Sequence, residues 1–382
     1  MEKRVVIIDF NHQAHTYFHS KFRLSARVRS SDGEMVEKDT TVQNGCIKNI
    51  FRWSKMGKYP TAVCFDRPVI SRKAYFQSQF PDMKIGTEGE YKGNRSKMPD
   101  ALFEAVQDCE SILRKAGVSV FAETGYEADD LIYACVKRAK EKYPGMPIDI
   151  ITNDADLLPL VDDTVSVFIR SKKGTYAERK DLEKAKYIQV TPRNFQEVVE
   201  DLSDYKGFLI PYNSLLLHKL LRGDNSDNYK RKDISRLFSP TKYNAMIQAM
   251  LDDYVNFAEV FRYGDPQVKV YYKGTDMPFN GTVEDAKRSP DRAKLYMKIS
   301  NSEELDAIIS LLKEFTPMDE GMLDHIEKMY WGVNLNQPYP NPDARLMRRA
   351  FVVGAQGKGD IDTYDEFKLE EAVSPLQIRL SH

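Results

Sequence analysis

The positions of nine acidic residues constrain this chain more than any other feature of its sequence. They fall in five short segments with the sequences VVIIDFN, TAVCFD, GYEADDL, ITNDADL and RGDNSDN. The nine are Asp9, Asp66, Glu127, Asp129, Asp130, Asp154, Asp156, Asp224 and Asp227. Three of the segments end an apolar run that is typical of a buried strand. Because Asp is rarely buried there unless it is paired or binds a metal, we interpret the set as a candidate site.

The spacing of apolar residues predicts the fold of the N-terminal half. Short β-branched runs indicate strands at residues 5–8, 61–65, 148–152 and 165–169, and helical spacing indicates helices at 42–55, 100–115 and 127–142. Strands that alternate with helices favour an α/β fold with a parallel sheet. The functional crevice of such a sheet lies outside the carboxyl ends of its strands. We therefore expect Asp9, Asp66 and Asp154 to lie together.

The chain after residue 212 has a different pattern, which separates residues 1–212 as a core from a helical C-terminal region over 213–340. Helical spacing occurs at 214–221, 243–254 and 302–315, and VKVYYKGTDMPF, within residues 264–292, is a possible hairpin. Residues 341–382 show no clear period. For them we expect loose packing or an appended arm, without an assigned role.

The composition is ordinary for a soluble globular protein, with 42% hydrophobic and 30% charged residues. No apolar run approaches the ~20 residues that cross a membrane, and the run before Asp9 is too short for a signal peptide, so we expect a cytoplasmic protein. The four cysteines lack zinc spacing, which favours reduced, buried thiols. The net charge of −1 argues against nucleic-acid binding. However, nine acids committed to metal ions would leave the remaining surface net basic.

A carboxylate cluster without His or Cys favours Mg²⁺ or Mn²⁺, which prefer oxygen ligands. Two such ions ~4 Å apart can activate a water molecule and stabilise the leaving oxygen of a phosphodiester. Local spacing fits this interpretation, because paired acids should face the same way. The expected pairs are Glu127 with Asp130 on one helical face, beside Asp129; Asp154 with Asp156 in an extended loop; and Asp224 with Asp227 in a turn. Each segment has an ordinary alternative, a capped helix start or a turn.

The chain resembles the 5′-nucleases, which include flap endonucleases, the 5′-nuclease domains of DNA polymerases and, most similar, the bacteriophage 5′–3′ exonuclease and RNase H branch. The motifs that carry the resemblance are IIDFN, CFD followed by SRKAY, EYKGNR, GYEADDL, TNDADL and GDNSDN, within residues 1–260. The resemblance implies a PIN-like α/β core, a helical arch at residues 84–115 and a helical DNA-binding appendage.

The same resemblance implies roles for individual residues. The first metal would be held or oriented by Asp9, Asp66, Glu127, Asp129 and Asp130, and the second, partly through water, by Asp154, Asp156, Asp224 and Asp227. Lys92 and Arg95 would clamp the scissile phosphate as the catalytic basic pair. Arg72 and Lys73 would contact nucleic acid, and Tyr91 would stack on the terminal base. The alternatives are a solvated basic loop for Lys92 and Arg95 and ordinary packing for Tyr91.

The chain departs from the family after GDNSDN, where most members have a Gly-rich hairpin that binds duplex. Here the sequence is YKRKDISRLFSPTKY, without glycine. Direct phosphate contacts by Lys230, Arg231 and Lys232 could replace the duplex binding by that hairpin. The alternative is a solvated basic turn. The terminal SPLQIRL faintly resembles a sliding-clamp peptide, the alternative being a packed or disordered tail.

Taken with the residues, the resemblance implies a two-metal nuclease that uses Mg²⁺, with Mn²⁺ as a substitute. It would hydrolyse phosphodiester bonds at 5′ ends or flaps of DNA and RNA–DNA hybrids, as in primer removal during phage replication in the host cytoplasm. We expect a monomer, with a single-strand-binding protein or a clamp as possible protein partners. Two alternatives stay open: a catalytically silent nucleic-acid-binding protein on the same fold, and a PIN-type ribonuclease.

Overall fold

The computed structural model of the chain contains a central six-stranded sheet. The structure describes residues 2–67, 70–80, 91–93, 96–170, 187–202, 205–211, 214–224, 227, 238–253, 268–272, 294–299, 317–333 and 361–378, with short pieces between 277 and 313 and residues 335 and 380. The strands are β1 (Val5–Asp9), β4 (Thr61–Cys64), β5 (Ser119–Phe121), β6 (Ile148–Ile151), β7 (Val165–Arg170) and β8 (Tyr187–Val190). Their order is β5-β4-β1-β6-β7-β8. All neighbours are parallel except β8, which is an antiparallel edge strand beside β7. The predicted α/β fold with a parallel sheet is confirmed.

The register of the three central strands brings the acidic segments to one edge. Asp9, the last residue of β1, lies beside Cys64, the last residue of β4, and Ile8 lies beside Ile151, the last residue of β6. Asp66 and Asp154 follow β4 and β6 within a few residues. The strand ends therefore converge as the sequence predicted.

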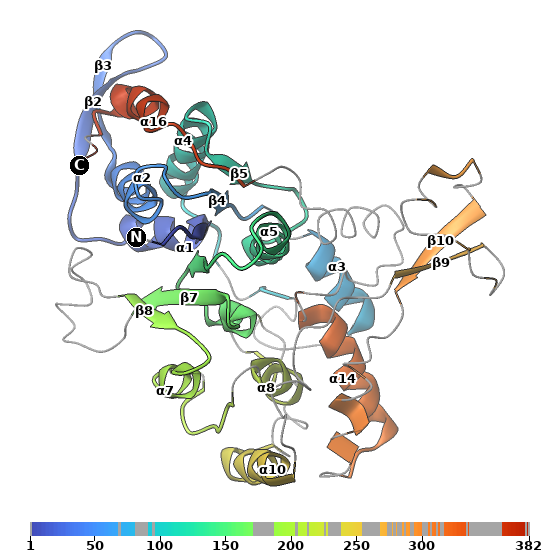
Figure 1. Cartoon of the computed structure of the whole chain (residues 1–382). Coiled ribbons are helices and arrows are strands. Elements are labelled where there is room, and N and C mark those ends of the chain that lie inside the picture. The colour runs from blue at the N-terminus through green and yellow to red at the C-terminus, as the bar shows by residue number, and fades with distance from the viewer. Residues whose placement is uncertain are drawn as a thin grey trace.

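Helices cover both faces of the sheet, as Figure 1 shows. Side chains of β1 alternate between two cores, because Val5 and Ile7 belong to one and Val6 and Ile8 to the other. The second core receives α1 (Phe10–Phe18), α2 (Thr41–Trp53), α4 (Asp100–Lys115) and α16 (Glu366–Val373). The first receives α3 (Ile70–Gln79), α5 (Ala128–Lys142), α7 (Phe195–Glu200), α8 (Leu215–Arg222), α10 (Pro240–Asp253) and α14 (Glu320–Val333).

Helix α4 belongs to this core, so the prediction that the arch extends over residues 84–115 was wrong for its C-terminal part. Leu102, Val106, Cys109 and Leu113 recur at helical spacing and are buried on one face of α4. This apolar face packs against α2 and α16 and cannot also span open solvent. Residues 84–90, 94 and 95 of the predicted arch lie outside the described residues.

The segment 361–378 packs on the core, so the expectation of a loose or appended arm was wrong for these residues. The carbonyl of Asp362 accepts a hydrogen bond from the Thr61 amide at the start of β4 (3.1 Å). The hydroxyls of Tyr364 and Ser54 lie 2.5 Å apart. Ile378, within the predicted clamp-like peptide, is buried in the second core. Helix α16 is short, which explains why its period was not recognised in the sequence.

Two antiparallel ribbons complete the described structure. Strand β9 (Val268–Tyr272), the start of the predicted hairpin, pairs with β10 (Leu295–Ile299), and most of the residues that follow β9 directly lie outside the described residues. Strands β2 (Ser25–Arg29) and β3 (Met35–Asp39) form a protruding antiparallel hairpin at the top left of Figure 1. The predicted helix at 302–315 lies largely outside the described residues. All four cysteines are buried and free, as predicted. Among the described helices, none is both long enough and apolar enough to cross a membrane.

Candidate metal centre and its basic surround

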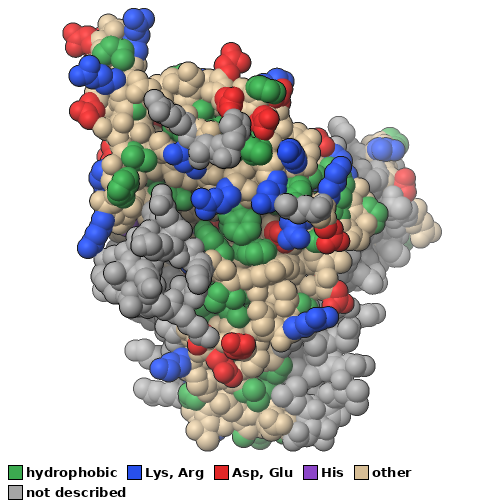
Figure 2. Space-filling view, turned by 60° about the vertical axis from the view of Figure 1, so that its left-hand side comes forward, with side chains coloured by type: hydrophobic (Ala, Val, Ile, Leu, Met, Phe, Trp, Pro, Cys, Tyr) green, Lys and Arg blue, Asp and Glu red, His purple; other side chains and the backbone are tan. Residues whose placement is uncertain are grey.

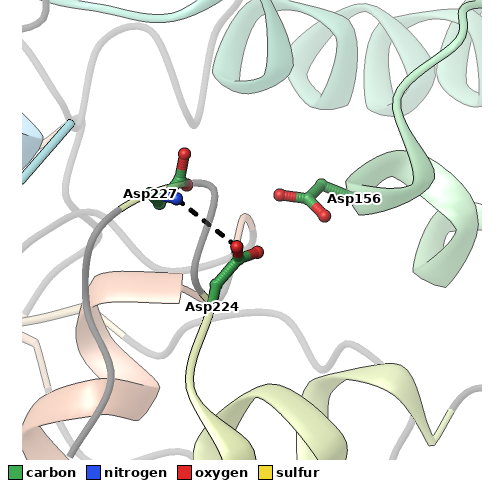
Figure 3. A group of neighbouring side chains, drawn as sticks. All are labelled: Asp156, Asp224 and Asp227. Carbon is green, nitrogen blue, oxygen red and sulfur yellow. Dashed lines mark hydrogen bonds between the residues drawn. The ribbon is translucent and has the colours of Figure 1, made fainter. Parts of the chain in front are cut away.

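Three carboxylates from two distant segments form the clearest candidate metal site. Asp156, Asp224 and Asp227 each offer an oxygen, and these oxygens all lie within 4.8 Å of one another. Asp156 lies in the first turn of η1 (Ala155–Leu160), a 3-10 helix after β6, whereas Asp224 and Asp227 follow α8 (Figure 3). The amide of Asp227 donates to Asp224 Oδ1 (3.4 Å). The expectation that these two acids lie close together is confirmed.

Lys219 of α8 partly neutralises this group. Its Nζ lies 2.6 Å from Asp156 Oδ2 and 3.5 Å from Asp224 Oδ2, and the residue is only 8% exposed. Burial raises the pKa of Asp156 to about 7, with Lys219 opposing the rise and the neighbouring aspartates adding to it. One ammonium therefore does not balance the negative charge, and an all-oxygen donor set of this kind fits a hard divalent cation.

A second acidic group lies at the ends of β1 and β6. Asp9 Oδ2 accepts a hydrogen bond from Thr152 Oγ1 (2.6 Å), and the same hydroxyl accepts from the Asp154 amide (2.9 Å). Burial raises the pKa of Asp9, and burial together with the charges of Asp154 and Glu127 raises that of Asp129 well above its ordinary value. Asp154 is thus grouped with Asp9 and Asp129.

His12 is the cationic partner of this second group. Its Nε2 lies 3.5 Å from Asp154 Oδ2. Burial alone would lower the pKa of His12, but the Asp154 hydrogen bond and the charges of the nearby aspartates raise it to about 9. Burial likewise opposes ionisation of Asp154, yet His12 holds the pKa of that carboxyl below its ordinary value. The expectation that Asp154 and Asp156 face the same way in an extended loop was wrong, because Asp154 caps η1 and Asp156 turns toward Lys219.

Asp66 connects β4 to the start of α5. Its Oδ1 accepts a hydrogen bond from the Ala128 amide (2.8 Å), and its own amide donates to Asn11 Oδ1 (3.2 Å). Burial, with the charge of Asp9, raises the pKa of Asp66 to about 6. The carboxylate is thus fixed by a backbone amide beside the second acidic group.

Glu127 and Asp130 form a capping box at the N-terminus of α5 and share one cation. The Glu127 amide donates to Asp130 Oδ2 (3.1 Å). Arg72 of α3 places Nη1 2.8 Å from Glu127 Oε2 and Nη2 2.7 Å from Asp130 Oδ1. Its guanidinium, predicted to contact nucleic acid, is 6% exposed and lies between these two carboxylates. The two acids share a face as expected, and the capped helix start is present as well.

Tyr91 and Lys92 join Glu127 to the three-carboxylate group. The hydroxyl of Tyr91 lies 3.2 Å from both Glu127 Oε2 and Asp227 Oδ2, and its ring stacks on Phe76 with 5.0 Å between centroids. At 4% exposure, the ring leaves almost no open face for a base, which favours the packing alternative. Lys92 Nζ contacts Glu127 and lies 3.7 Å from Asp227 Oδ1. The Lys92 amide also donates to the Asp227 carbonyl (3.0 Å).

A narrow cavity opens onto these groups and is closed on one side by the end of α14. Asp129, Asp156 and Lys219 line it, together with Gly332. A Cβ at Gly332 would lie 2.3 Å from Phe76 Cζ, so the site requires glycine there. The arrangement can bind cations and receive an anionic group between acidic and basic side chains.

His12, Lys219 and Gly332 were not among the residues predicted from the sequence. A lysine inside the apolar run LLLHKLL was a usable signal for Lys219, and His12 lies three residues after Asp9. Nothing in the sequence around Gly332 predicts that this position requires glycine. Of the remaining predicted residues, Lys73 lies half-buried in α3, while Arg95, Lys230, Arg231 and Lys232 lie outside the described residues.

Comparison with known proteins gives relatives for part of the chain. DNA polymerase I of Lactococcus lactis is 34% identical over 140 residues, which are 37% of this chain and 14% of that protein. The 5′-3′ exonuclease of Mycoplasma pneumoniae is 30% identical over 164 residues, or 43% and 48% of the two chains. The chain thus spans less than half the length of these relatives.

Solved structures and a family model give further matches. The flap endonuclease of bacteriophage T5, in a complex with DNA and metal ions, aligns at a TM-score of 0.48 with 14% identity, covering 98% of this chain and 100% of the other. Residues 4–188 match the model of the 5′-3′ exonuclease, N-terminal resolvase-like domain. Residues 4–188 of the chain are therefore similar to the 5′-3′ exonuclease N-terminal, resolvase-like domain family.

Proposed function

We propose that the chain is a metal-dependent 5′ nuclease that hydrolyses phosphodiester bonds at 5′ ends or flaps of DNA and RNA–DNA hybrids. One observation carries the proposal: acids from five separate segments converge at the carboxyl edge of the sheet, with buried cations among them. Packing alone does not explain such a cluster, because burying carboxylates is costly. The family of residues 4–188 supports the same activity.

The carboxylates fit two divalent ions, Mg²⁺ with Mn²⁺ as a substitute. Asp156, Asp224 and Asp227 would hold one, and Asp9, Asp129 and Asp154 the other, with Asp66, Glu127 and Asp130 orienting the second set. This grouping moves Asp154 from its predicted set, because Thr152 and His12 tie it to Asp9. Bound ions would supply an activated water and neutralise charge on the phosphodiester.

The side chains of the chain itself would position the substrate. Lys92 Nζ contacts Glu127 at the edge of the acidic site, from which the flexible side chain could reach a phosphate oxygen. Arg72 would fix Glu127 and Asp130 rather than bind substrate, since its guanidinium pairs with both. His12 would keep a proton on Nε2 and hold Asp154 ionised. Arg95 stays a predicted partner of Lys92.

The proposed function also includes the remaining predictions made from the sequence. We propose a core over residues 1–212 followed by a helical region to 340, with duplex phosphate contacts by Lys230, Arg231 and Lys232. A monomer in the host cytoplasm that acts with a single-strand-binding protein or a clamp fits the same role. The predicted division into domains did not include one contact: segment 361–378 packs against the core formed by the N-terminal half of the chain.

Cleavage of a 5′-labelled flap duplex tests the proposal, with Mg²⁺ and with EDTA. We expect the wild type to release short 5′ products only with metal. Asp156→Asn should abolish release while retaining binding, because Asp156 lies in the metal group. Asp163→Asn, at an exposed position after η1, is the matched control and should cleave normally.

The other outcomes separate the alternatives. Tight binding without cleavage in Mg²⁺ or Mn²⁺ would indicate the catalytically silent binding protein. Preference for single-stranded RNA over the flap would indicate a PIN-type ribonuclease. Equal cleavage in EDTA would refute the metal site.

A further inference from the structure

A second cavity lies beside α1, away from the acidic site. The α1 residues that line it are Gln13, Thr16 and Tyr17. It forms where α1 and α2 meet the adjacent ends of β7 and β8, and it is open to solvent on one side. Its lining residues are distinct from those of the acidic cavity.

The charge of this cavity is positive. Arg52 of α2 and Arg170, the last residue of β7, both line it, and none of its described lining residues is acidic. Figure 2, which turns this side of the molecule toward the viewer, shows Lys and Arg side chains gathered beside hydrophobic ones in the middle of the face. Guanidinium groups match the geometry of phosphate oxygens and bind them through paired hydrogen bonds.

Aromatic side chains form another part of the wall. Trp53 and Tyr187 line the cavity, with 5.5 Å between their ring centroids at an interplanar angle of 86°. Trp53 also packs edge-on against Phe168 (4.9 Å). The rings are therefore held in place before any ligand arrives. Such surfaces stack on nucleobases of any sequence.

Gln13 adds a polar group that needs a partner. It is 2% exposed, and its side-chain oxygen accepts a hydrogen bond from Asn49 Nδ2 (2.9 Å). This bond fixes the amide, while Nε2 has no hydrogen-bond partner among the described residues. An unsatisfied buried donor is costly. Because Gln13 also lines the cavity, a ligand that carries an acceptor atom would satisfy it.

We propose that this cavity binds a nucleotide, with its phosphate at Arg52 and Arg170, its base against Trp53 and Tyr187, and an acceptor atom at Gln13 Nε2. The nucleotide could be a free monophosphate or one unit of a single strand, since both present the same chemistry. The proposal goes beyond the nuclease function and does not depend on it.

One residue connects the cavity to the acidic site. Asn153 Nδ2 donates to Thr16 Oγ1 (3.4 Å), and Asn153 Oδ1 accepts from the Arg170 amide (3.2 Å). Thr16 lines the cavity, and Asn153 directly precedes Asp154. A bound nucleotide would therefore lie next to the loop that carries an acid of the candidate metal centre.

Tryptophan fluorescence tests the proposal without cleavage. The chain has two tryptophans, so Trp331→Phe leaves Trp53 as the only reporter. In EDTA, we expect adenosine 5′-monophosphate to quench Trp53 saturably and adenosine to bind at least tenfold more weakly. Arg52→Gln should weaken monophosphate binding about tenfold, the effect of one lost charged hydrogen bond, and leave adenosine binding unchanged. Arg170→Gln is a second variant, and Arg114→Gln, at an exposed position of α4, is the matched control.

Titration with pentathymidylate distinguishes the source of the ligand. Binding much tighter than that of the monophosphate would assign the site to a strand, and similar binding would assign it to a free nucleotide. Absence of saturable quenching by either probe would overturn the proposal. Binding that survives both arginine variants, or that is lost in Asp156→Asn, would also overturn it, because the ligand would then lie elsewhere.

Discussion

The buried ammonium of Lys219 should determine how stable the protein is without metal. Its Nζ lies 2.6 Å from Asp156 and 3.5 Å from Asp224. Lys219→Met keeps the length of the side chain and removes the charge. Removing one partner of a buried ion pair costs about 3–5 kcal/mol. Because a proton can neutralise Asp156, we expect the lower end, about 3 kcal/mol of unfolding free energy at pH 8 in EDTA.

The cost should depend on pH in a defined direction. The folded-state pKa of Asp156 is raised to about 7, above the value of about 3.9 for an unfolded chain. Between these values the folded state binds the extra proton, so stability falls as pH rises, by at most about 1.4 kcal/mol per pH unit. Without Lys219 the folded pKa rises further and this window extends above pH 7. The variant should therefore approach the wild type at pH 5 and differ most at pH 8.

Urea unfolding at pH 5 and pH 8, with EDTA and with Mg²⁺, measures both effects. Lys97→Met is the matched control, because Lys97 forms a solvent-exposed pair with Asp100 at 3.1 Å. Its loss should cost less than about 1 kcal/mol. Mg²⁺ should stabilise Lys219→Met more than the wild type, since the ion would replace the missing charge. Equal losses at both pH values, or no response to Mg²⁺, would refute the reasoning.

Two further variants test the packing around the site. Gly332→Ala should destabilise the protein by about 1–3 kcal/mol in urea unfolding, because its Cβ would lie 2.3 Å from Phe76. Gly321→Ala in the same helix meets nothing closer than 3.4 Å and should be neutral or stabilising, and an equal loss in both would contradict the argument. Tyr364→Phe should cost about 1 kcal/mol, because it removes the hydrogen bond to Ser54 that attaches the C-terminal segment. An unchanged unfolding midpoint would indicate that this bond does not stabilise the fold.

The parts of the structure that could be predicted depend on local pattern. The runs VVIID and IDII alternate between two buried faces, and the ends of parallel strands meet at one edge, so Asp9 and Asp154 could be placed together from sequence. Asp224 and Asp227 are three residues apart, so their proximity could likewise be expected from local spacing. Such relations need no knowledge of distant contacts.

The parts that could not be predicted depend on residues far apart in the chain. Arg72 and Asp130 are 58 residues apart, and Tyr364 reaches Ser54 across 310 residues. Spacing alone does not encode such pairings. A basic residue near an acidic motif indicates substrate binding and ion pairing equally well. The family resemblance therefore implied that Arg72 contacts nucleic acid, whereas its guanidinium is buried between two carboxylates.

The distribution of cations also predicts how the two acidic groups differ. Among the described residues, ion pairs from Lys or Arg reach Asp156, Asp224 and Asp227 but not Asp9 or Asp129. The pKa values of Asp9 and Asp129 are raised chiefly by burial, which the charge of Lys92 only partly opposes at Asp129, so a divalent ion there would relieve a cost that no lysine or arginine ion pair offsets. At the three-carboxylate group an arriving ion must first displace Lys219. We therefore expect two Mg²⁺ binding events of unequal affinity in calorimetry, with Lys219→Met strengthening the weaker one. A single affinity, unchanged in that variant, would show that Lys219 does not compete with metal.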